Sequence, residues 1–102
     1  MNKSATATQA AAIFSSAAAY IRKYGWQEEG MSVHGKPRCS MGALESAYPE
    51  RKWDKDLASI MYEALYRKLN GVSLTQYNRR VRSGEKVAML YENVATSLIK
   101  QS

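Results

Sequence analysis

The sequence has few of the residues that build disulfides, metal sites and phosphate-binding loops. It contains one cysteine, one histidine, two prolines and six glycines among 102 residues. One cysteine permits no disulfide within the chain, so a cytoplasmic location is the default expectation. Cys39 and His34 are too few ligands for a structural zinc site, and no glycine-rich phosphate loop is present. We therefore expect no metal and no other cofactor.

The chain also lacks a long hydrophobic run. Its longest weakly polar stretch, residues 10–21, is rich in alanine and holds two serines. That stretch is too short and too polar to span a bilayer. A basic region of any strength and an obvious cleavage site are missing as well, so we expect neither a signal peptide nor a membrane partner.

The residues that are present describe an ordinary globular protein with a basic surface. Hydrophobic residues make up 45% of the chain, with seven tyrosines and two tryptophans. Its length suits one domain, which we place at residues 6–102 after a disordered segment at residues 1–5. The formal net charge of +6 favours an acidic partner, either nucleic acid or an acidic protein surface.

Four to five helices are predicted from apolar residues at helical spacing and from capping residues at their ends. The first helix covers residues 7–24. A capping box of Thr6 and Gln9 opens it, and Gly25 ends it in a left-handed conformation. Trp26 then stands where a hydrophobic contact back to the last turn of the helix is expected.

The later helices carry the same signals. Asp54 caps a helix that ends at residues 70–71, Ser73 and Gln76 form a second capping box, and Ser83 caps the last helix. The apolar stripes of these helices, together with the first helix, define the predicted core. Its members are Phe14, Ile21, Trp26, Leu57, Ile60, Met61, Leu65, Leu69, Val87, Leu90, Val94 and Leu98.

Residues 30–44 have a different pattern. His34 and Gly35 suit a two-residue hairpin turn, and Pro37 fits the second strand if its outer edge is unpaired or covered by a helix. Ser40 then caps a short helix. The predicted fold class is therefore α+β, with four to five helices packed around a two-stranded β-hairpin.

The order of these features resembles an uncharacterised family of small domains, of unknown function, seen mainly in actinobacteria and their phages. Its pattern runs G-W…G…C-A-L-G-A…W-N-D…R-T-x-E-E-V, and the resemblance covers about residues 16–99. The matching positions are Gly25, Trp26, Gly35, Cys39, Gly42, Ala43, Leu44, Tyr77, Asn78, Ser83, Glu85 and Val87. Tyr77 replaces the family's tryptophan, and Arg79 replaces its acidic residue. The resemblance implies a compact α+β domain and a phage or mobile-element origin, with no established reaction, cofactor or substrate.

Cys39 is the one candidate nucleophile. It stands beside a predicted helix start and follows Arg38, and both features lower the pKa of a thiol. Its only candidate base, His34, would lie at the loop end of the hairpin, far from the thiol. We expect Cys39 to be a buried apolar residue, and a small enzyme or ligand-binding site near Cys39 is the alternative.

The basic segment from Arg67 to Lys86 is the stronger functional signal. Its candidate partner-binding residues are Arg67, Lys68, Thr75, Gln76, Tyr77, Asn78, Arg79, Arg80, Arg82 and Lys86. Basic residues interleaved with tyrosines suit a nucleic-acid backbone with stacked bases. A helix-turn-helix is an alternative, in which Thr75, Gln76, Asn78 and Arg79 would read bases. The bulky Arg67, where that motif usually has a small residue, departs from it.

Simpler structural roles compete with these hypotheses. Tyr77 can pack on the core and Asn78 can satisfy loop carbonyls, while the basic residues can form a solvated face. No pair of carboxylates lies among apolar residues, so acid–base catalysis has little support. We predict a small non-enzymatic accessory protein that binds a host protein or nucleic acid, with the phage or mobile-element origin that the resemblance implies.

Overall fold

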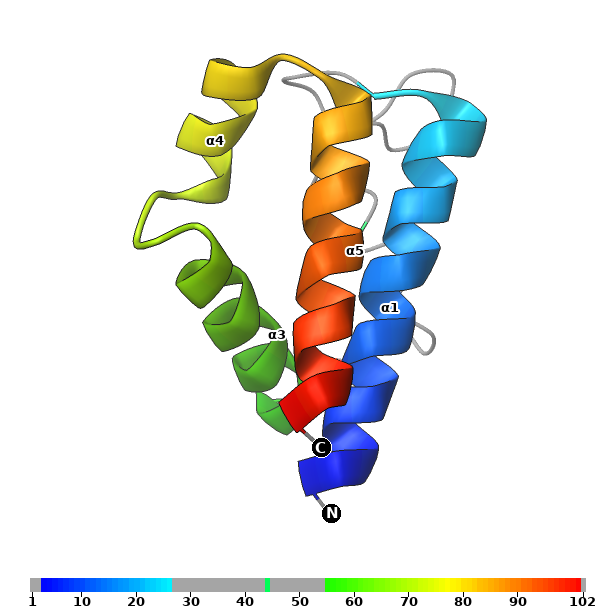
Figure 1. Cartoon of the computed structure of the whole chain (residues 1–102), viewed down its shortest axis with the longest axis vertical. Helices are drawn as coiled ribbons and strands as arrows, with labels where there is room; N and C mark the ends of the chain where they lie inside the picture. The colour runs from blue at the N-terminus through cyan, green and yellow to red at the C-terminus, as the bar shows by residue number, and fades with distance from the viewer. Residues whose placement is uncertain (1–2, 27–43, 45–54, 102) are drawn as a thin grey trace.

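The computed structural model of the chain describes residues 3–26, 44 and 55–101. These residues form four helices: α1 (Lys3–Tyr24), α3 (Lys55–Lys68), α4 (Leu74–Val81) and α5 (Gly84–Gln101), shown in Figure 1. No strand occurs within the described ranges. The predicted α+β class is therefore wrong, and the fold is all-α.

The α+β prediction rested on a local turn signal, which says nothing about what covers the core. The helices cover one another's apolar faces directly, so the core needs no sheet to close it. The predicted hairpin and the motif residues Gly35, Cys39, Gly42 and Ala43 lie outside the described residues. Of the predicted short helix, Leu44 alone is described; it is helical and buried in the core.

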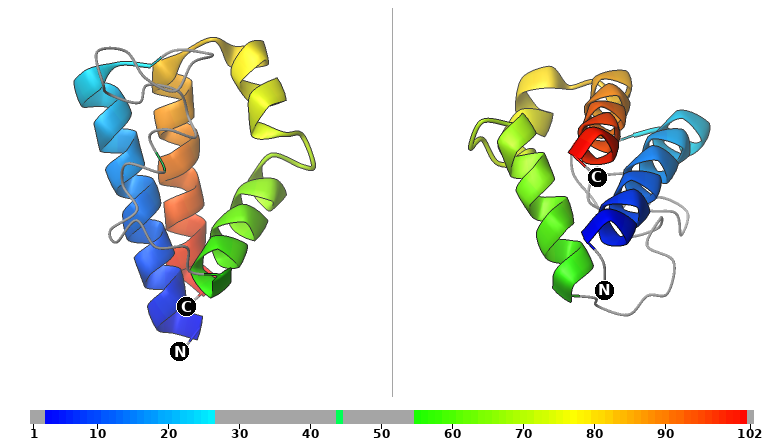
Figure 2. Two further views of the ribbon diagram at one scale, coloured as in Figure 1. Left: turned by 180° about the vertical axis from the view of Figure 1, so that it is seen from behind. Right: turned by 60° about the horizontal axis from the view of Figure 1, so that its bottom comes forward.

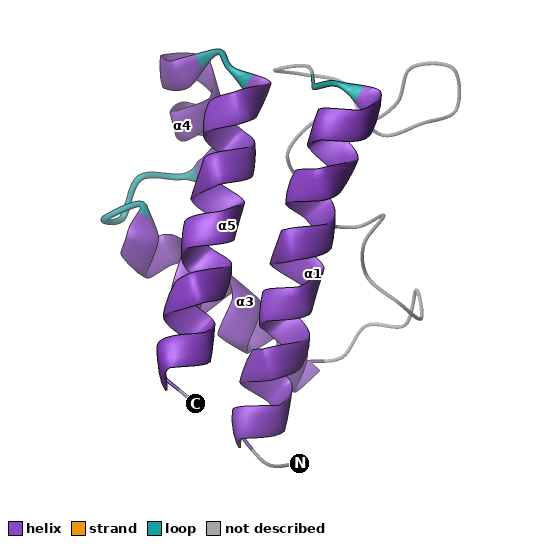
Figure 3. Cartoon of the chain, turned by 45° about the vertical axis from the view of Figure 1, so that its right-hand side comes forward, coloured by secondary structure: helices purple, strands orange, loops and turns teal. Residues whose placement is uncertain are grey.

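The antiparallel pair of α1 and α5 forms the centre of the molecule (Figure 3). Seven alanines of the two helices are buried: Ala7, Ala10, Ala11, Ala17 and Ala18 of α1, and Ala88 and Ala95 of α5. Such small side chains let helices approach closely. The fully buried rings of Phe14 and Tyr91 join the two helices, with ring centroids 5.4 Å apart and planes tilted by 60°.

The two ends of α1 compare differently with the prediction. The helix begins at Lys3, four residues before the predicted start, and Thr6 is buried inside it. The capping box of Thr6 and Gln9 is therefore wrong as the helix start. The predicted left-handed cap is confirmed, because Gly25 has φ +89° and its N–H donates to the carbonyl of Ile21 at 2.8 Å.

The end of α3 and the starts of α4 and α5 follow the sequence signals closely, while the predicted cap Asp54 lies outside the described residues. Asn70 and Gly71 end α3 with φ +53° and +83°. Ser73 and Gln76 form both hydrogen bonds of the predicted capping box at α4. The Ser83 hydroxyl accepts the N–H of Lys86 at 3.2 Å and so caps α5.

The predicted core is confirmed in its main part. Ten of its twelve residues are buried, while Ile60 and Trp26 are half-buried against the same cluster. Figure 2 shows α3 and α4 on one side of α5 and α1 on the other, with α3 reaching far enough to pack on both long helices.

The first turn of α5 lies against the end of α1. A Cβ atom built on Gly84 would stand 2.8 Å from the Cβ of Trp26 and 3.4 Å from the Cγ2 of Ile21. Contacts below 3.0 Å are too short for real Cβ atoms, so the absence of a side chain at Gly84 permits this approach. Gly84 therefore sets how closely the two helix ends meet.

Candidate functional site: a basic groove between α3, α4 and α5

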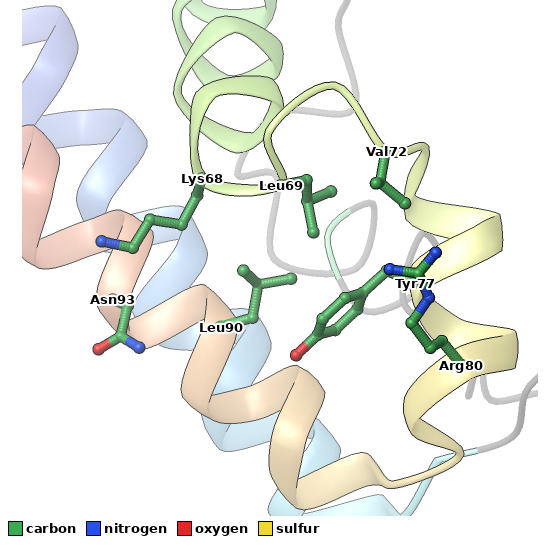
Figure 4. Close-up of a pocket in the computed structure, with 7 residues that line it drawn as sticks. All are labelled: Lys68, Leu69, Val72, Tyr77, Arg80, Leu90 and Asn93. Carbon is green, nitrogen blue, oxygen red and sulfur yellow. The ribbon is translucent and has the colours of Figure 1, made fainter.

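A groove of about 370 Å³ opens where the end of α3, the following turn, α4 and α5 meet (Figure 4). We call it the basic groove. It is lined by Lys68, Leu69, Val72, Tyr77, Arg80, Leu90 and Asn93. Three segments of the sequence contribute to it, because α4 folds back after the turn and packs on α5.

The floor of the basic groove is apolar and its rim is cationic. Leu69 and Leu90 are buried and Val72 is half-buried, so aliphatic carbons form the floor. Lys68 lies beside Asn93 at one end, and Arg80 lies beside Tyr77 at the other (Figure 4). Among the residues that the structure describes, the lining therefore includes two cations and no carboxylate.

Tyr77 holds α4 against α5. Its hydroxyl donates to the backbone carbonyl of Lys86 at 3.4 Å, and its half-buried ring packs on the core. Burial raises the pKa of Tyr77 above its usual value of 10, so the hydroxyl is protonated at neutral pH. Tyr77 thus has the packing role considered from the sequence, and it also lines the groove.

The acidic side chains of α5 are turned away from the groove toward α1. Arg22 of α1 binds both Glu85 and Glu92: its Nη2 lies 2.9 Å from Glu85 Oε1, and its Nη1 lies 2.6 Å from Glu92 Oε2. Hydrogen bonds from Arg22 lower the pKa of both carboxyls. We call these three residues the Arg22 bridge.

The groove side of α5 carries a different set of residues. Leu90 and Asn93 line the groove, and Ser97 accepts a hydrogen bond from Lys68 Nζ at 3.4 Å. These positions recur at the spacing of one helix face, separate from the face of Glu85 and Glu92. One helix thus presents its acids to α1 and its neutral residues to the groove.

We expect Arg22→Gln to lower the urea midpoint at pH 7 and to weaken the dependence of stability on acidic pH. Because the folded-state pKa values of Glu85 and Glu92 are below the ordinary 4.5, their contribution is present above that pH. It is lost as the pH falls through the lowered values. Urea titrations of both proteins between pH 2.5 and 7 measure the difference, which should shrink at the acidic end.

Arg67→Gln is the matched control for this prediction. Arg67 also makes an exposed ion pair, with Glu63 Oε1 at 2.6 Å, but the pair lies within one helix. Such pairs contribute little, so the control should change the midpoint less than Arg22→Gln. A difference between wild type and Arg22→Gln that stayed constant over the pH range would contradict the prediction and indicate lost packing instead.

The structure brings together only part of the predicted site. Lys68, Tyr77 and Arg80 meet in the groove. Arg67 is exposed and paired with Glu63, and Lys86 is exposed on α5, where its carbonyl accepts the Tyr77 hydroxyl. The sequence therefore identified the cations but not their separate positions.

Four residues of the predicted helix-turn-helix lie on α4 in different settings. Thr75 and Arg79 are exposed, the side chain of Gln76 is used by the capping box, and Asn78 is buried. Arg82, which follows, is the left-handed C-cap of α4 with φ +46°. DNA reading by α4 stays a prediction. Two of its four proposed base readers, Gln76 and Asn78, have structural roles in the capping box and in the buried interior.

Sequence reasoning missed the contribution of α5 to the groove. Leu90 was predicted as a core residue, and Asn93 was not singled out. No signal in the sequence marks Asn93, because its place in the groove depends on how α4 packs across α5. The Arg22 bridge was missed for the same reason, since Glu85 and Glu92 lie 63 and 70 residues after Arg22 in the chain.

The described residues contain neither a membrane-spanning helix nor a cluster of metal-binding side chains. No helix among them is long and apolar enough to cross a membrane. Nor do the described residues contain a group of three or more His, Cys, Asp or Glu side chains that could hold a metal ion.

The fold is that of a small helical domain, and its groove has an apolar floor and a cationic rim. Residues 5–97 match DUF6197, a family of unknown function, and the chain belongs to that family. An uncharacterised domain family, as the sequence motifs suggested, is thereby confirmed. No curated protein and no solved structure gives a significant match.

Proposed function

We propose that the protein is a small non-enzymatic binding protein that docks an acidic macromolecule, a protein or a nucleic acid, at the basic groove. This proposal rests on the separation of charges around α5, with the acidic side chains on its α1 side and the cations on its groove side. Arg22 binds Glu85 and Glu92 on the α1 side, whereas Lys68 and Arg80 flank a groove whose described lining has no carboxylate. An acidic partner would thus meet two cations without repulsion from the groove wall.

The lining of the groove favours binding over catalysis. Its described residues include no carboxylate, histidine or cysteine for acid–base or nucleophilic chemistry. Its one titratable hydroxyl, that of Tyr77, has a raised pKa and donates to a backbone carbonyl. These features leave shape and charge as the properties through which the groove acts.

An accessory role in a phage or mobile element, and action in the cytoplasm, complete this proposal. The phage role rests on the motif resemblance seen in the sequence. The cytoplasmic setting rests on the single cysteine. The charge of +6 fits a setting rich in acidic proteins and nucleic acids.

The test measures the binding of a random-sequence DNA duplex and of poly-L-glutamate by fluorescence anisotropy from about 50 to 200 mM salt. We expect at least one probe to bind, and binding to weaken as salt rises. For the duplex, the log–log slope is about −0.9 for each phosphate neutralised. Reversing both rim charges, with Lys68→Glu and Arg80→Glu together, should therefore flatten that slope by roughly two units.

Lys55→Glu is the control for position, because it makes the same charge change as Lys68→Glu alone, at the opposite end of α3. The 13 positions between Lys55 and Lys68 correspond to about 20 Å along a helix. The control should keep most of the affinity that the double variant loses. If wild type binds neither probe at about 50 mM salt, where non-specific binders associate, the proposed function is wrong.

A further inference from the structure

We infer that the partner of the basic groove is an acidic amphipathic segment of another protein, which inserts an apolar side chain between Lys68 and Arg80. This inference rests on the proposed function and specifies its partner. It follows from three properties of the groove: an apolar floor, cations at opposite ends, and too few cations for a nucleic-acid track.

The floor supports an apolar anchor. Leu69, Val72 and Leu90 present aliphatic carbons to the groove, and about 370 Å³ is at the small end of the range for binding pockets. A phosphate or a sugar would gain nothing from such a floor. A leucine or phenylalanine side chain would displace water from it, which is the driving force of helix-in-groove recognition.

The rim supports carboxylates on either side of that anchor. Lys68 and Arg80 are both exposed, and neither belongs to an ion pair in the described part of the chain. Lys68 Nζ donates to the hydroxyl of Ser97 at 3.4 Å, a neutral partner. Incoming carboxylates would therefore pair with these cations without breaking an internal salt bridge.

The distribution of the other cations argues against a nucleic acid. Arg67 pairs with Glu63, and Arg22 pairs with two glutamates on the α1 side. Three further exposed cations, Arg79, Arg82 and Lys86, are not among the described residues that line the groove. Strong association with a duplex draws on some 6–10 phosphate contacts, whereas the groove rim offers two cations. Its single aromatic ring, Tyr77, is half-buried and tied to α5 through its hydroxyl. Stacking of successive bases therefore has little support here.

The experiment compares two synthetic peptides of equal length and equal negative charge. Both carry glutamates on one helical face; the other face carries leucines in the first peptide and serines in the second. Fluorescence anisotropy with full-length protein gives the dissociation constants. We expect the leucine peptide to bind at least about tenfold more tightly. The free energy gained by burying one leucine side chain exceeds that of a tenfold change in the dissociation constant.

Two variants place the binding in the groove. Lys68→Glu with Arg80→Glu should weaken the leucine peptide by at least about tenfold, while Lys55→Glu should stay within about twofold. Val72→Ser, which makes the floor more polar, should weaken the leucine peptide and leave the serine peptide unchanged. Thermal melts by circular dichroism verify that each variant is folded before its binding is compared.

Each of the other possible results contradicts a specific part of the two proposals. Equal binding of the two peptides means that charge alone acts and that no side chain inserts. If neither the double rim variant nor Val72→Ser weakens binding of the leucine peptide, the peptide binds outside the groove. If the DNA duplex binds and neither peptide does, the proposed function stands and the peptide partner is wrong. If peptides, poly-L-glutamate and duplex all fail to bind, both proposals are wrong.

Discussion

Phe14→Ala is expected to destabilise the protein by about 3–5 kcal/mol, the usual cost of deleting a buried ring. Phe14 is fully buried, and its ring lies 5.4 Å from that of Tyr91, which is also fully buried. The replacement removes a contact between α1 and α5 and leaves a cavity in the centre of their interface. A domain of this size has about 5–15 kcal/mol of stability in total, so the loss is a large share of it.

Urea unfolding followed by circular dichroism measures this change, with two comparison variants. Phe14→Leu keeps most of the apolar volume and should cost clearly less than the alanine variant. Ser15→Ala, at an exposed neighbouring position on α1, should stay within about 0.5 kcal/mol of wild type. A Phe14→Ala protein as stable as Ser15→Ala would show that the Phe14–Tyr91 contact does not hold the two helices together.

Gly84→Ala is expected to destabilise the protein by about 1–3 kcal/mol, the usual cost of an overpacked contact. The sign is the informative part, because alanine is a better helix former than glycine by up to about 1 kcal/mol. At this position the new methyl group would stand 2.8 Å from the Cβ of Trp26. That atom lies next to the backbone, so the end of α1 or the start of α5 must move to make room.

Asparagine substitutions at Gly71 and at Gly84 provide the control. At Gly71, where φ is +83°, asparagine tolerates the left-handed backbone, and the nearest atom is the flexible Tyr66 hydroxyl at 3.3 Å. Gly71→Asn should therefore cost less than Gly84→Asn in the same urea assay. A Gly84→Ala variant with a raised unfolding midpoint would refute the close approach of α5 to Trp26.

Helix boundaries were predictable where the signals are local. The capping box of Ser73 and Gln76 lies within four residues and forms as predicted, and so does the left-handed end of α1 at Gly25. Thr6 matches the same kind of pattern and fails, because its side chain is buried within a helix that begins earlier. A capping pattern describes only its own few residues, whereas burial depends on the rest of the chain.

The site was predictable as a collection of charges but not as a shape. Lys68 and Arg80 were found because they stand in a basic segment of the sequence. The groove between them requires α4 to pack on α5, and it requires Glu85 and Glu92 to be taken up by Arg22. Neither condition can be predicted from the residues near Lys68, because both depend on contacts between distant parts of the chain.

The pairing of α1 with α5 has a consequence for how the chain folds during its synthesis. Helix α5 begins 60 residues after α1 ends, so the main partner of α1 leaves the ribosome after the other described helices. At about 5–20 residues per second, α1 waits on the order of 3–12 seconds for that partner. An alanine-rich helix suits such a delay. Alanine favours the helix without tertiary contacts, and its small methyl groups expose less apolar surface to passing chains than leucine would. The same distant pairing raises the contact order, so we expect this domain to fold more slowly than helical bundles whose neighbouring helices pair first.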